Sequence, residues 1–248
     1  MNVVYGPVRS WRLGRSIGID PICIEPKVCT FNCVYCRLGN KGIVTEERSE
    51  FVGEDVVRDQ LGSLLRKKVK ADVVTLSGTG EPTLARNLKK LVALVRDMTD
   101  MPIAILTNSS LFQDPDVRDA MRLFDVLVAK LDASNERTFQ KVNRPHPSMD
   151  FRKVLANLET MRKEFEGSFR LQIMFVEENM RDAEEIAGIC DRVEPDLVYL
   201  NTPLRPNMIR PLGRREMRSI SRDFARFRSR MVYEAEPERR PDRVKQQR

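Results

Sequence analysis

Ala71-Asp72-Val73-Val74-Thr75-Leu76-Ser77-Gly78-Thr79-Gly80-Glu81-Pro82, residues 71–82, is the stretch that decides the fold. Its first half is short, apolar and β-branched, which predicts a buried strand over residues 71–76. Its second half is a polar loop with two glycines, and residues 84–97 follow with the apolar spacing of a helix. The stretch therefore predicts one strand–loop–helix unit with polar groups at the carboxyl end of its strand.

The same unit recurs along the chain on both sides of this stretch. Further strands are predicted at residues 17–24, 103–106, 126–131, 169–176 and 197–200. Helices are predicted at residues 54–68, 116–122, 135–142, 151–165, 182–193 and 215–228. Strands that alternate with helices pair in parallel, because each return to the sheet crosses over through a helix. About six such units predict an α/β domain whose sheet is either open and barrel-like or doubly wound.

The net charge of +7 is concentrated near the C-terminus. Residues 205–248 hold 14 basic and 6 acidic side chains, whereas residues 1–204 hold 29 and 30. We therefore expect a near-neutral core domain over residues 1–204 and a basic extension over residues 205–248, helical at first and disordered from Glu234. Two interpretations of the extension stay open: a handle for an anionic substrate or RNA, and a solvated tail.

The chain has no stretch that approaches the roughly 20 apolar residues of a membrane span, and its N-terminus lacks the apolar core of a signal peptide. We expect a cytoplasmic protein that does not bind membranes. Three of its five cysteines lie within eight residues, too close together to staple a fold as disulfides. In a reducing compartment such a group more often binds metal or does redox chemistry. The single histidine excludes sites that need two imidazoles.

Polar residues follow all six predicted strands. They are the cysteine segment and residues 77–82, 107–110, 130–132, 177–179 and 201–202. Taken singly, each is also typical of a turn or a helix cap. Because the carboxyl ends of parallel strands meet at one edge, the set predicts a site that spans the whole mouth of the sheet.

The cysteine segment carries the sharpest signal. Cys29, Cys33 and Cys36 have the spacing C-x3-C-x2-C, which suits an iron–sulfur cluster or zinc. A zinc site would take Cys23, His146 or a carboxylate as its fourth ligand. The same spacing also puts three side chains on one helical face, but Pro26 and Gly39 in the flanks favour a loop.

Cys29, Cys33, Tyr35 and Cys36 resemble the C-x3-C-x-aromatic-C signature of the radical S-adenosylmethionine (SAM) superfamily, and the resemblance extends to the strand order over residues 9–206. It implies a partial (β/α)6 TIM-type barrel of parallel strands with outer helices. It also implies a 4Fe-4S cluster on the three cysteines, whose open iron binds SAM. In that family a flavodoxin- or ferredoxin-type donor supplies one electron, and SAM breaks into methionine and a 5′-deoxyadenosyl radical that abstracts hydrogen from the substrate.

The resemblance also implies cofactor contacts at the strand ends. Gly78, Gly80 and Glu81 resemble the family's Gly-Gly-Glu element, which receives the methionine ammonium, and a dinucleotide loop is disfavoured because a third glycine is lacking. The remaining expected SAM contacts come from the other strand ends and from the aromatic residue of the signature: Asn108, Ser109, Lys130, Asp132, Asn179 and Tyr35. For the charged pair a plain salt bridge, and for the tyrosine a core position, are the competing interpretations.

A closer resemblance is to small radical SAM iron–sulfur oxidoreductases akin to wyosine synthases. Its motifs contain residues that suit a carboxylate or phosphate, or that are simply surface groups: Arg9, Arg12, Arg15, Arg144, His146 and Arg205. Wyosine synthases carry a second cluster, for which Cys23 and Cys190 are too few, so a wyosine role is not expected.

Catalytic residues and substrate stay open at this point. RNA or a phosphorylated metabolite competes with a partner protein as the substrate. The alternative to an enzyme is a non-catalytic metal-binding or electron-transfer protein that uses the three cysteines structurally.

Overall fold

The computed structural model describes residues 2–205 and 209–234 of the chain. Its centre is an eight-stranded sheet with the order β1-β2-β5-β6-β7-β8-β9-β10. The strands are β1 Val4–Ser10, β2 Gly14–Ile19, β5 Val73–Leu76, β6 Ile103–Thr107, β7 Val126–Lys130, β8 Ser168–Met174, β9 Leu197–Asn201 and β10 Ser229–Met231. β1 and β2 pair antiparallel, and every other neighbouring pair in this sheet is parallel.

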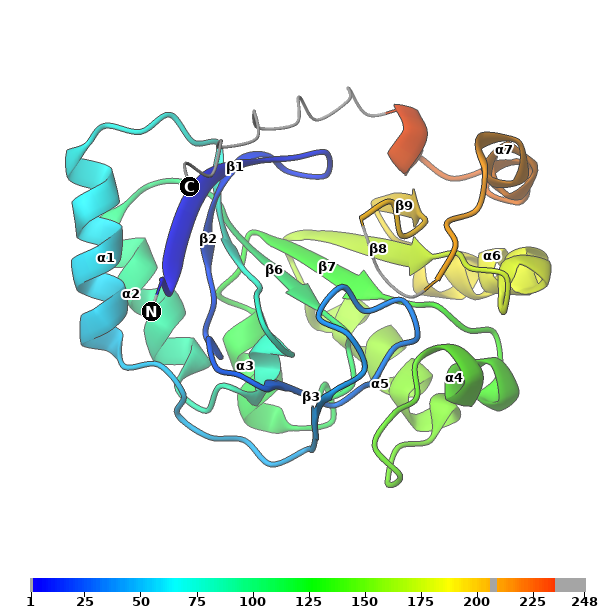
Figure 1. Ribbon diagram of the computed structural model, residues 1–248, viewed down its shortest axis with the longest axis horizontal. Helices are drawn as coiled ribbons and strands as arrows, with labels where there is room; N and C mark the ends of the chain where they lie inside the picture. The colour runs from blue at the N-terminus through cyan, green and yellow to red at the C-terminus, as the bar shows by residue number, and fades with distance from the viewer. Residues whose placement is uncertain (1, 206–208, 235–248) are drawn as a thin grey trace, which may run out of the picture.

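The sheet curls, and the helices cover its convex face (Figure 1). They are α1 Glu54–Arg66, α2 Leu88–Met98, α3 Pro115–Met121, α4 Glu136–Val142, α5 Phe151–Glu164, α6 Ala183–Val193 and α7 Arg214–Asp223. Short 3-10 turns occupy Pro82–Leu84, Met180–Asp182 and Val232–Glu234. The predicted partial barrel of parallel strands with outer helices is therefore confirmed.

Side chains alternate between the two faces of each strand, as the pleat requires. On β7, Leu127 and Ala129 belong to the large apolar cluster that includes the helices, whereas Val126 and Val128 belong to a separate, smaller cluster. The smaller cluster fills the lower lumen of the barrel with residues of β5, β6, β7 and β9. The lumen is therefore packed near the amino-terminal ends of the strands.

The β1–β2 hairpin closes the amino-terminal end of the lumen. Trp11 and Leu13, in its turn, pack against the smaller cluster, and the Trp11 ring meets Tyr199 edge-to-face with centroids 5.3 Å apart. The Tyr199 hydroxyl donates to the Arg12 carbonyl over 2.7 Å. β1 was not predicted, because its middle residues are exposed and show no apolar alternation.

Three predicted boundaries need correction. The strand expected over residues 17–24 is β2 at Gly14–Ile19, because the Asp20 carboxylate accepts from the N–H groups of Ile22 and Cys23 and ends the strand. The helix expected from residue 84 begins at Leu88, because Pro82–Leu84 form a 3-10 turn that the Glu81 side chain caps by accepting from the Thr83 N–H. The helix expected over residues 215–228 ends at Asp223, and the chain continues into β10 beside β9. Burial of Met217, Ile220 and Phe224 attaches this region to the body.

Two short strands lie outside the main sheet. β3 Lys27–Cys29 pairs with β4 Gly42–Val44 in a small second sheet, which the sequence analysis missed.

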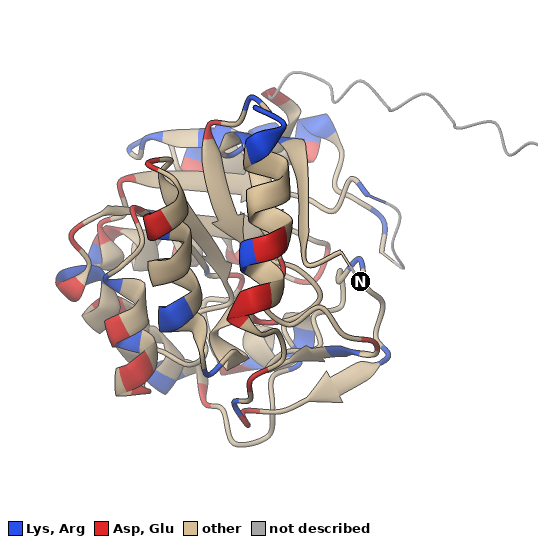
Figure 2. Ribbon diagram, turned by 90° about the vertical axis from the view of Figure 1, so that its left-hand side faces the viewer, with Lys and Arg blue, Asp and Glu red and all other residues tan. Residues whose placement is uncertain are grey.

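The disorder expected from Glu234 onward falls on residues 235–248, which lie outside the described part of the chain. Basic and acidic residues are interspersed over the helices on the α1 side (Figure 2). In the described residues, none of the helices has the length and apolar character needed to cross a bilayer.

Candidate functional site

A cavity of about 900 Å³, including its open mouth, lies inside the barrel at the carboxyl ends of the strands. Most of the predicted site residues line it: Cys29, Cys33, Tyr35, Cys36, Gly78, Gly80, Glu81, Asn108 and Lys130. Arg12, which the sequence singled out as suited to an anion, also lines it, together with residues that were not predicted, among them Lys27, Arg37, Thr107 and Gln172. Segments from six parts of the chain thus meet at one concave surface, as expected of an α/β active site.

The cysteine segment is a loop held on the end of α4. The Val34 N–H donates to the Val142 carbonyl over 3.0 Å, and the His146 N–H donates to the Thr30 carbonyl over 2.9 Å. The Asn32 N–H reaches the carbonyls of residues 143 and 144. These main-chain bonds fix the three thiols in place, and the segment does not form the helical face considered as an alternative.

Side-chain amides approach two of the thiols. Asn108 Nδ2 lies 3.6 Å from Cys29 Sγ, and Asn143 Nδ2 lies 3.7 Å from Cys33 Sγ. Burial raises the pKa of the Cys29 thiol to about 12, and the Glu81 charge adds to this shift. Burial also raises the pKa of Cys33, while the Lys130 ammonium opposes the shift. The three thiols line the cavity, and in the described residues no three histidine, cysteine or acidic side chains are grouped as a metal site.

Gly78 and Gly80 occupy positions without room for a side chain. A Cβ on Gly78 would lie 1.9 Å from Cγ of Asp20, whose carboxylate accepts from the N–H groups of Ile22, Cys23 and Thr79. A Cβ on Gly80 would lie 1.8 Å from the Val28 carbonyl oxygen. Gly80 forms a parallel bridge with Val28, one residue before Cys29, and thereby sets the glycine element against the cysteine loop.

Glu81 is a buried carboxylate held by protein donors. Oε1 accepts from the Thr83 N–H, the Thr83 hydroxyl and the Thr107 hydroxyl, and Oε2 accepts from the Asn108 N–H over 2.7 Å. Burial raises the pKa of Glu81, and these hydrogen bonds partly offset the increase. Four donors fix the carboxylate at the cavity wall, with acceptor capacity remaining on Oε2.

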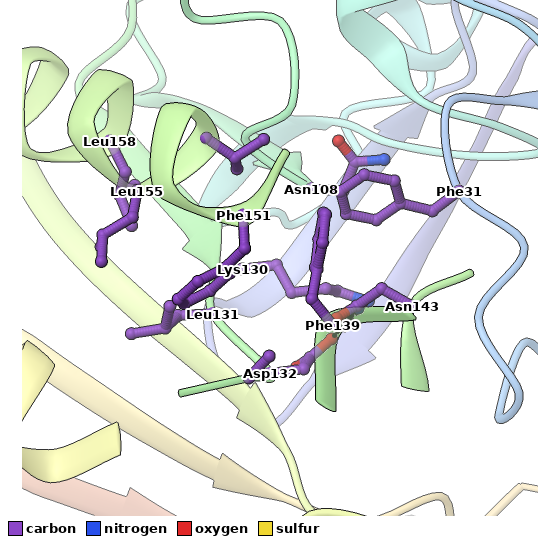
Figure 3. Close-up of a pocket in the computed structure, with 12 residues that line it drawn as sticks. Phe31, Asn108, Lys130, Leu131, Asp132, Phe139, Asn143, Phe151, Leu155 and Leu158 are labelled. Carbon is purple, nitrogen blue, oxygen red and sulfur yellow. Dashed lines mark hydrogen bonds and ion pairs between the residues drawn. The ribbon is translucent and has the colours of Figure 1, made fainter. Parts of the chain in front are cut away.

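A hydrogen-bonded network joins the cysteine loop to β7. The Tyr35 hydroxyl donates to Asp132 Oδ2, which also accepts from Asn143 Nδ2 over 2.8 Å. Lys130 Nζ donates to the Tyr35 hydroxyl over 2.8 Å and lies 3.9 Å from Asp132. Lys130, Asp132 and Asn143 converge in Figure 3, beside a small apolar pocket under α5. The network places a cation and an N–H donor beside the thiols.

Three predicted cofactor contacts do not line the cavity. Ser109 is buried with φ 70°, and its hydroxyl bonds to the main chain of Lys130. Asp132 lies behind Tyr35, where its Oδ1 also accepts from the Met174 N–H. Asn179 is fully buried, with its amide bonded to the carbonyls of Asp132 and Met174 and to the Val176 N–H. These three side chains hold the strand ends in position.

Three residues whose roles the sequence left open lie in different parts of the structure. Arg15 pairs with Asp72 on the surface, and His146 Nδ1 hydrogen-bonds with the Ser148 hydroxyl. Arg12 enters the cavity, and Asn143, which was not predicted as a site residue, contacts a thiol. Gln172 gave no signal, because a polar residue inside a strand is typical of any exposed face.

The chain matches a known protein family. The family model described as "Radical SAM superfamily" matches residues 26–189. The chain belongs to the radical SAM superfamily. Membership implies a SAM-dependent enzyme with an iron–sulfur cluster and supports radical chemistry; radical SAM enzymes typically need an external electron donor. The soft thiol donors, the two amide N–H groups and the nearby ammonium fit such a cluster.

Three relatives match most of this chain in sequence. The chain is 37% identical to UPF0026 protein slr1464 of Synechocystis, over 85% of this chain and 78% of that protein. It is 38% identical to UPF0026 protein MJ1312 of Methanocaldococcus jannaschii, over 83% of this chain and 65% of that protein. A protein named GTPase Obg of Brachyspira hyodysenteriae is 34% identical over 82% of this chain, which spans 30% of that protein's length.

Solved structures share the fold. TYW1 with a lysine-pyruvate adduct bound matches with a TM-score of 0.59 at 17% identity, over 84% of this chain and 72% of that one. Streptococcus suis SuiB bound to S-adenosylmethionine matches with a TM-score of 0.64 at 14% identity, over 83% of this chain and 48% of that one. At these identities the likeness establishes the partial barrel alone.

Proposed function

We propose that this chain binds a 4Fe-4S cluster through Cys29, Cys33 and Cys36 and cleaves SAM reductively to start a hydrogen abstraction. The observation that carries the proposal is that the three thiols and the Gly78–Glu81 element line one cavity at the carboxyl ends of the strands. A structural metal site would not need the glycine element or an open cavity beside it. The electron comes from a flavodoxin- or ferredoxin-type donor, which makes the enzyme oxidoreductase-like.

When bound, the cluster and SAM supply the radical chemistry, and the chain's own residues bind, orient and shield. The fixed Glu81 carboxylate and the main chain at Gly78 and Gly80 are the acceptors for the methionine ammonium. The Asn108 amide lies between Cys29 Sγ and the Thr30 hydroxyl, 2.7 Å from the latter, and would hold a hydrogen-bond donor beside the cluster. Tyr35, held by Lys130 and Asp132, forms the neighbouring wall.

Ser109, Asp132 and Asn179 act as positioning residues in this proposal. Each bonds to main chain at the ends of β7 or β8, where a buried polar group must be paired to be tolerated. Through those strand ends they set where Lys130 and the cysteine loop stand. Their replacement is expected to alter SAM affinity without removing a direct contact.

A small anionic substrate is favoured in this proposal, because four of the charged side chains that line the cavity are basic and one is acidic. A probable GTP 3′,8-cyclase of Methanococcus maripaludis is 26% identical over 64% of this chain and 48% of that protein. RNA and a partner protein are the other substrates considered. Activity toward any of them follows only if SAM is cleaved first.

Anaerobic reconstitution tests the proposal. The full chain is loaded with iron and sulfide, reduced and given SAM, and 5′-deoxyadenosine is expected. Cys33→Ala should lose iron and the product, whereas Cys190→Ala should keep both, because Cys190 is buried in α6 away from the cavity. Well-loaded protein that makes no 5′-deoxyadenosine, or one that binds zinc in place of iron, would favour the non-catalytic metal-binding alternative.

A further inference from the structure

The floor of the cavity is a polar pair supplied by the hairpin and β8. Arg12 sits in the β1–β2 turn, whose tip reaches across toward β8 and β9 (Figure 1). Arg12 Nη1 donates to Gln172 Oε1 over 2.8 Å, and both side chains line the cavity that holds the cysteines. Barrel lumens are ordinarily filled by apolar layers, so a guanidinium and an amide here depart from the packing expected of a structural core.

The surroundings hold this pair in place. Below it, Trp11 and Leu13 pack with the fully buried Tyr199, which anchors the Arg12 carbonyl. The Arg12 guanidinium lies 5.5 Å from the Trp11 ring centroid. Above it, Leu106 and Val128 face the same cavity, and Lys130 follows two residues later on β7. A bound molecule would therefore meet a charged floor, an apolar wall and then the cysteine end.

The charges of the side chains that line the cavity predict the sign of the charge on that molecule. Among the described residues that line the cavity, four are basic (Arg12, Lys27, Arg37 and Lys130) and one, Glu81, is acidic. An oxidised four-iron cluster with three thiolates carries about one negative charge, and SAM carries about one positive charge, so the two nearly cancel. Asp132 lies near Lys130 and offsets part of its charge. The Lys27 ammonium donates to two neutral acceptors, the Asn32 amide oxygen and the Gly39 carbonyl, which do not offset its charge. The side chains that line the cavity therefore include more basic than acidic groups, and Arg12 is the cation on its floor.

We propose that Arg12, with the Gln172 amide, binds the carboxylate or phosphate of a small substrate whose opposite end points toward the cysteines. With Oε1 accepting from Arg12, the Gln172 NH2 group is the second donor for the same anion. The closed floor suits a small molecule better than a nucleic-acid strand. The inference rests on the proposed function for the reaction that follows, but anion binding itself does not require SAM cleavage.

The single tryptophan makes the test direct. Full-length protein is labelled with 5-fluorotryptophan, loaded with cluster and SAM, and titrated with inorganic phosphate, succinate or uncharged succinamide while the ¹⁹F signal of Trp11 is followed. Phosphate or succinate should give a saturable shift that succinamide does not give. The stronger of the two anions distinguishes a phosphate substrate from a carboxylate substrate.

Variants assign the shift to the floor. Arg12→Gln should weaken anion binding about tenfold or more, and Gln172→Leu several-fold, while Arg9→Gln, exposed on the same hairpin, should match the parent. The inference would be overturned if neither anion gave a saturable shift. It would also be overturned if Arg12→Gln and Gln172→Leu bound the anion as tightly as the parent protein. Anion binding without 5′-deoxyadenosine would instead count against the proposed function alone, and product formation without anion binding against the floor site alone.

Discussion

The two ends of the barrel are built from opposite kinds of residues. At the carboxyl ends, Glu81, Asp132 and Asn143 are buried polar side chains in hydrogen-bonded networks. At the amino-terminal ends, Trp11, Leu13 and the lumen cluster form an apolar plug. Buried polar groups cost free energy unless they are paired, so a fold concentrates them where chemistry requires them. The difference assigns the cluster chemistry to the rim and stability to the plug that lies beneath the Arg12–Gln172 floor.

The cysteines carry the same lesson. Burial raises the pKa of both Cys29 and Cys190 to about 12, so burial does not distinguish a ligand from a core residue. Cys29 has an amide N–H at 3.6 Å and faces a cavity, whereas Cys190 lies within the apolar face of α6. The surroundings of a thiol, and not its depth, indicate its role.

The largest expected effect comes from crowding the rim at Gly80. Gly80→Ala puts a Cβ 1.8 Å from the Val28 carbonyl, so β3 and the attached Cys29 must move. We expect poor iron loading and a loss of SAM cleavage of at least about 100-fold, since displacements near 1 Å have effects of this size. Iron content and 5′-deoxyadenosine yield measure it. Gly188→Ala, where a Cβ meets nothing within 4 Å, is the control and should leave both unchanged.

A smaller rim effect is expected at Asn143. Asn143→Leu removes the N–H beside Cys33 Sγ, and hydrogen bonds to cluster sulfurs help stabilise the reduced state. The reconstituted variant should have a lower reduction potential and cleave SAM about tenfold more slowly, as an EPR-monitored redox titration and a product assay would report. Asn40→Leu, at an exposed position in the same loop region, is the control. Equal potentials in parent and Asn143→Leu would remove this amide from the site.

The plug should respond in stability instead of chemistry. Tyr199→Phe removes the hydroxyl that donates to the Arg12 carbonyl and accepts from Arg170 Nη1 over 2.9 Å. Leaving such partners unpaired costs about 1–3 kcal/mol, which urea unfolding would detect. Iron content should match the parent. A variant that lost its cluster while staying folded would contradict the division between rim and plug.

The smallest effect is expected at the surface of the hairpin. The Arg15 guanidinium and N–H hold the pKa of Asp72 below its ordinary value. A depressed carboxyl pKa contributes stability above the unfolded-state value of about 4 and loses it as the pH falls through the folded-state pKa. Asp72→Asn should therefore lower the melting temperature slightly at about pH 7 and have little effect at about pH 3. An equal difference at both values would mean that the ion pair is not the cause.

Much of the fold could be predicted from periodicity. Strands β5, β6, β7, β8 and β9 and helices α1, α4, α5 and α6 lie close to their predicted places, because each buries a regular apolar face. β1, β3, β4 and β10 escaped because short or exposed strands depend on pairing with distant partners. Ser109 and Asn179 were predicted as cofactor contacts because a polar residue at a strand end gives the same sequence pattern in two cases. Its side chain can face the lumen, or it can bond to the main chain.

The sequence by itself determined the cysteine loop, the glycine element and the alternation of strands and helices, because spacing and periodicity are local properties. Only the tertiary structure decided which strand-end groups share a cavity, that Asn143 reaches Cys33 across 110 residues, and that Arg12 reaches Gln172 across 160. Such contacts depend on how the sheet curls and how a hairpin closes it. Those features follow from packing many segments together, and no single segment encodes them.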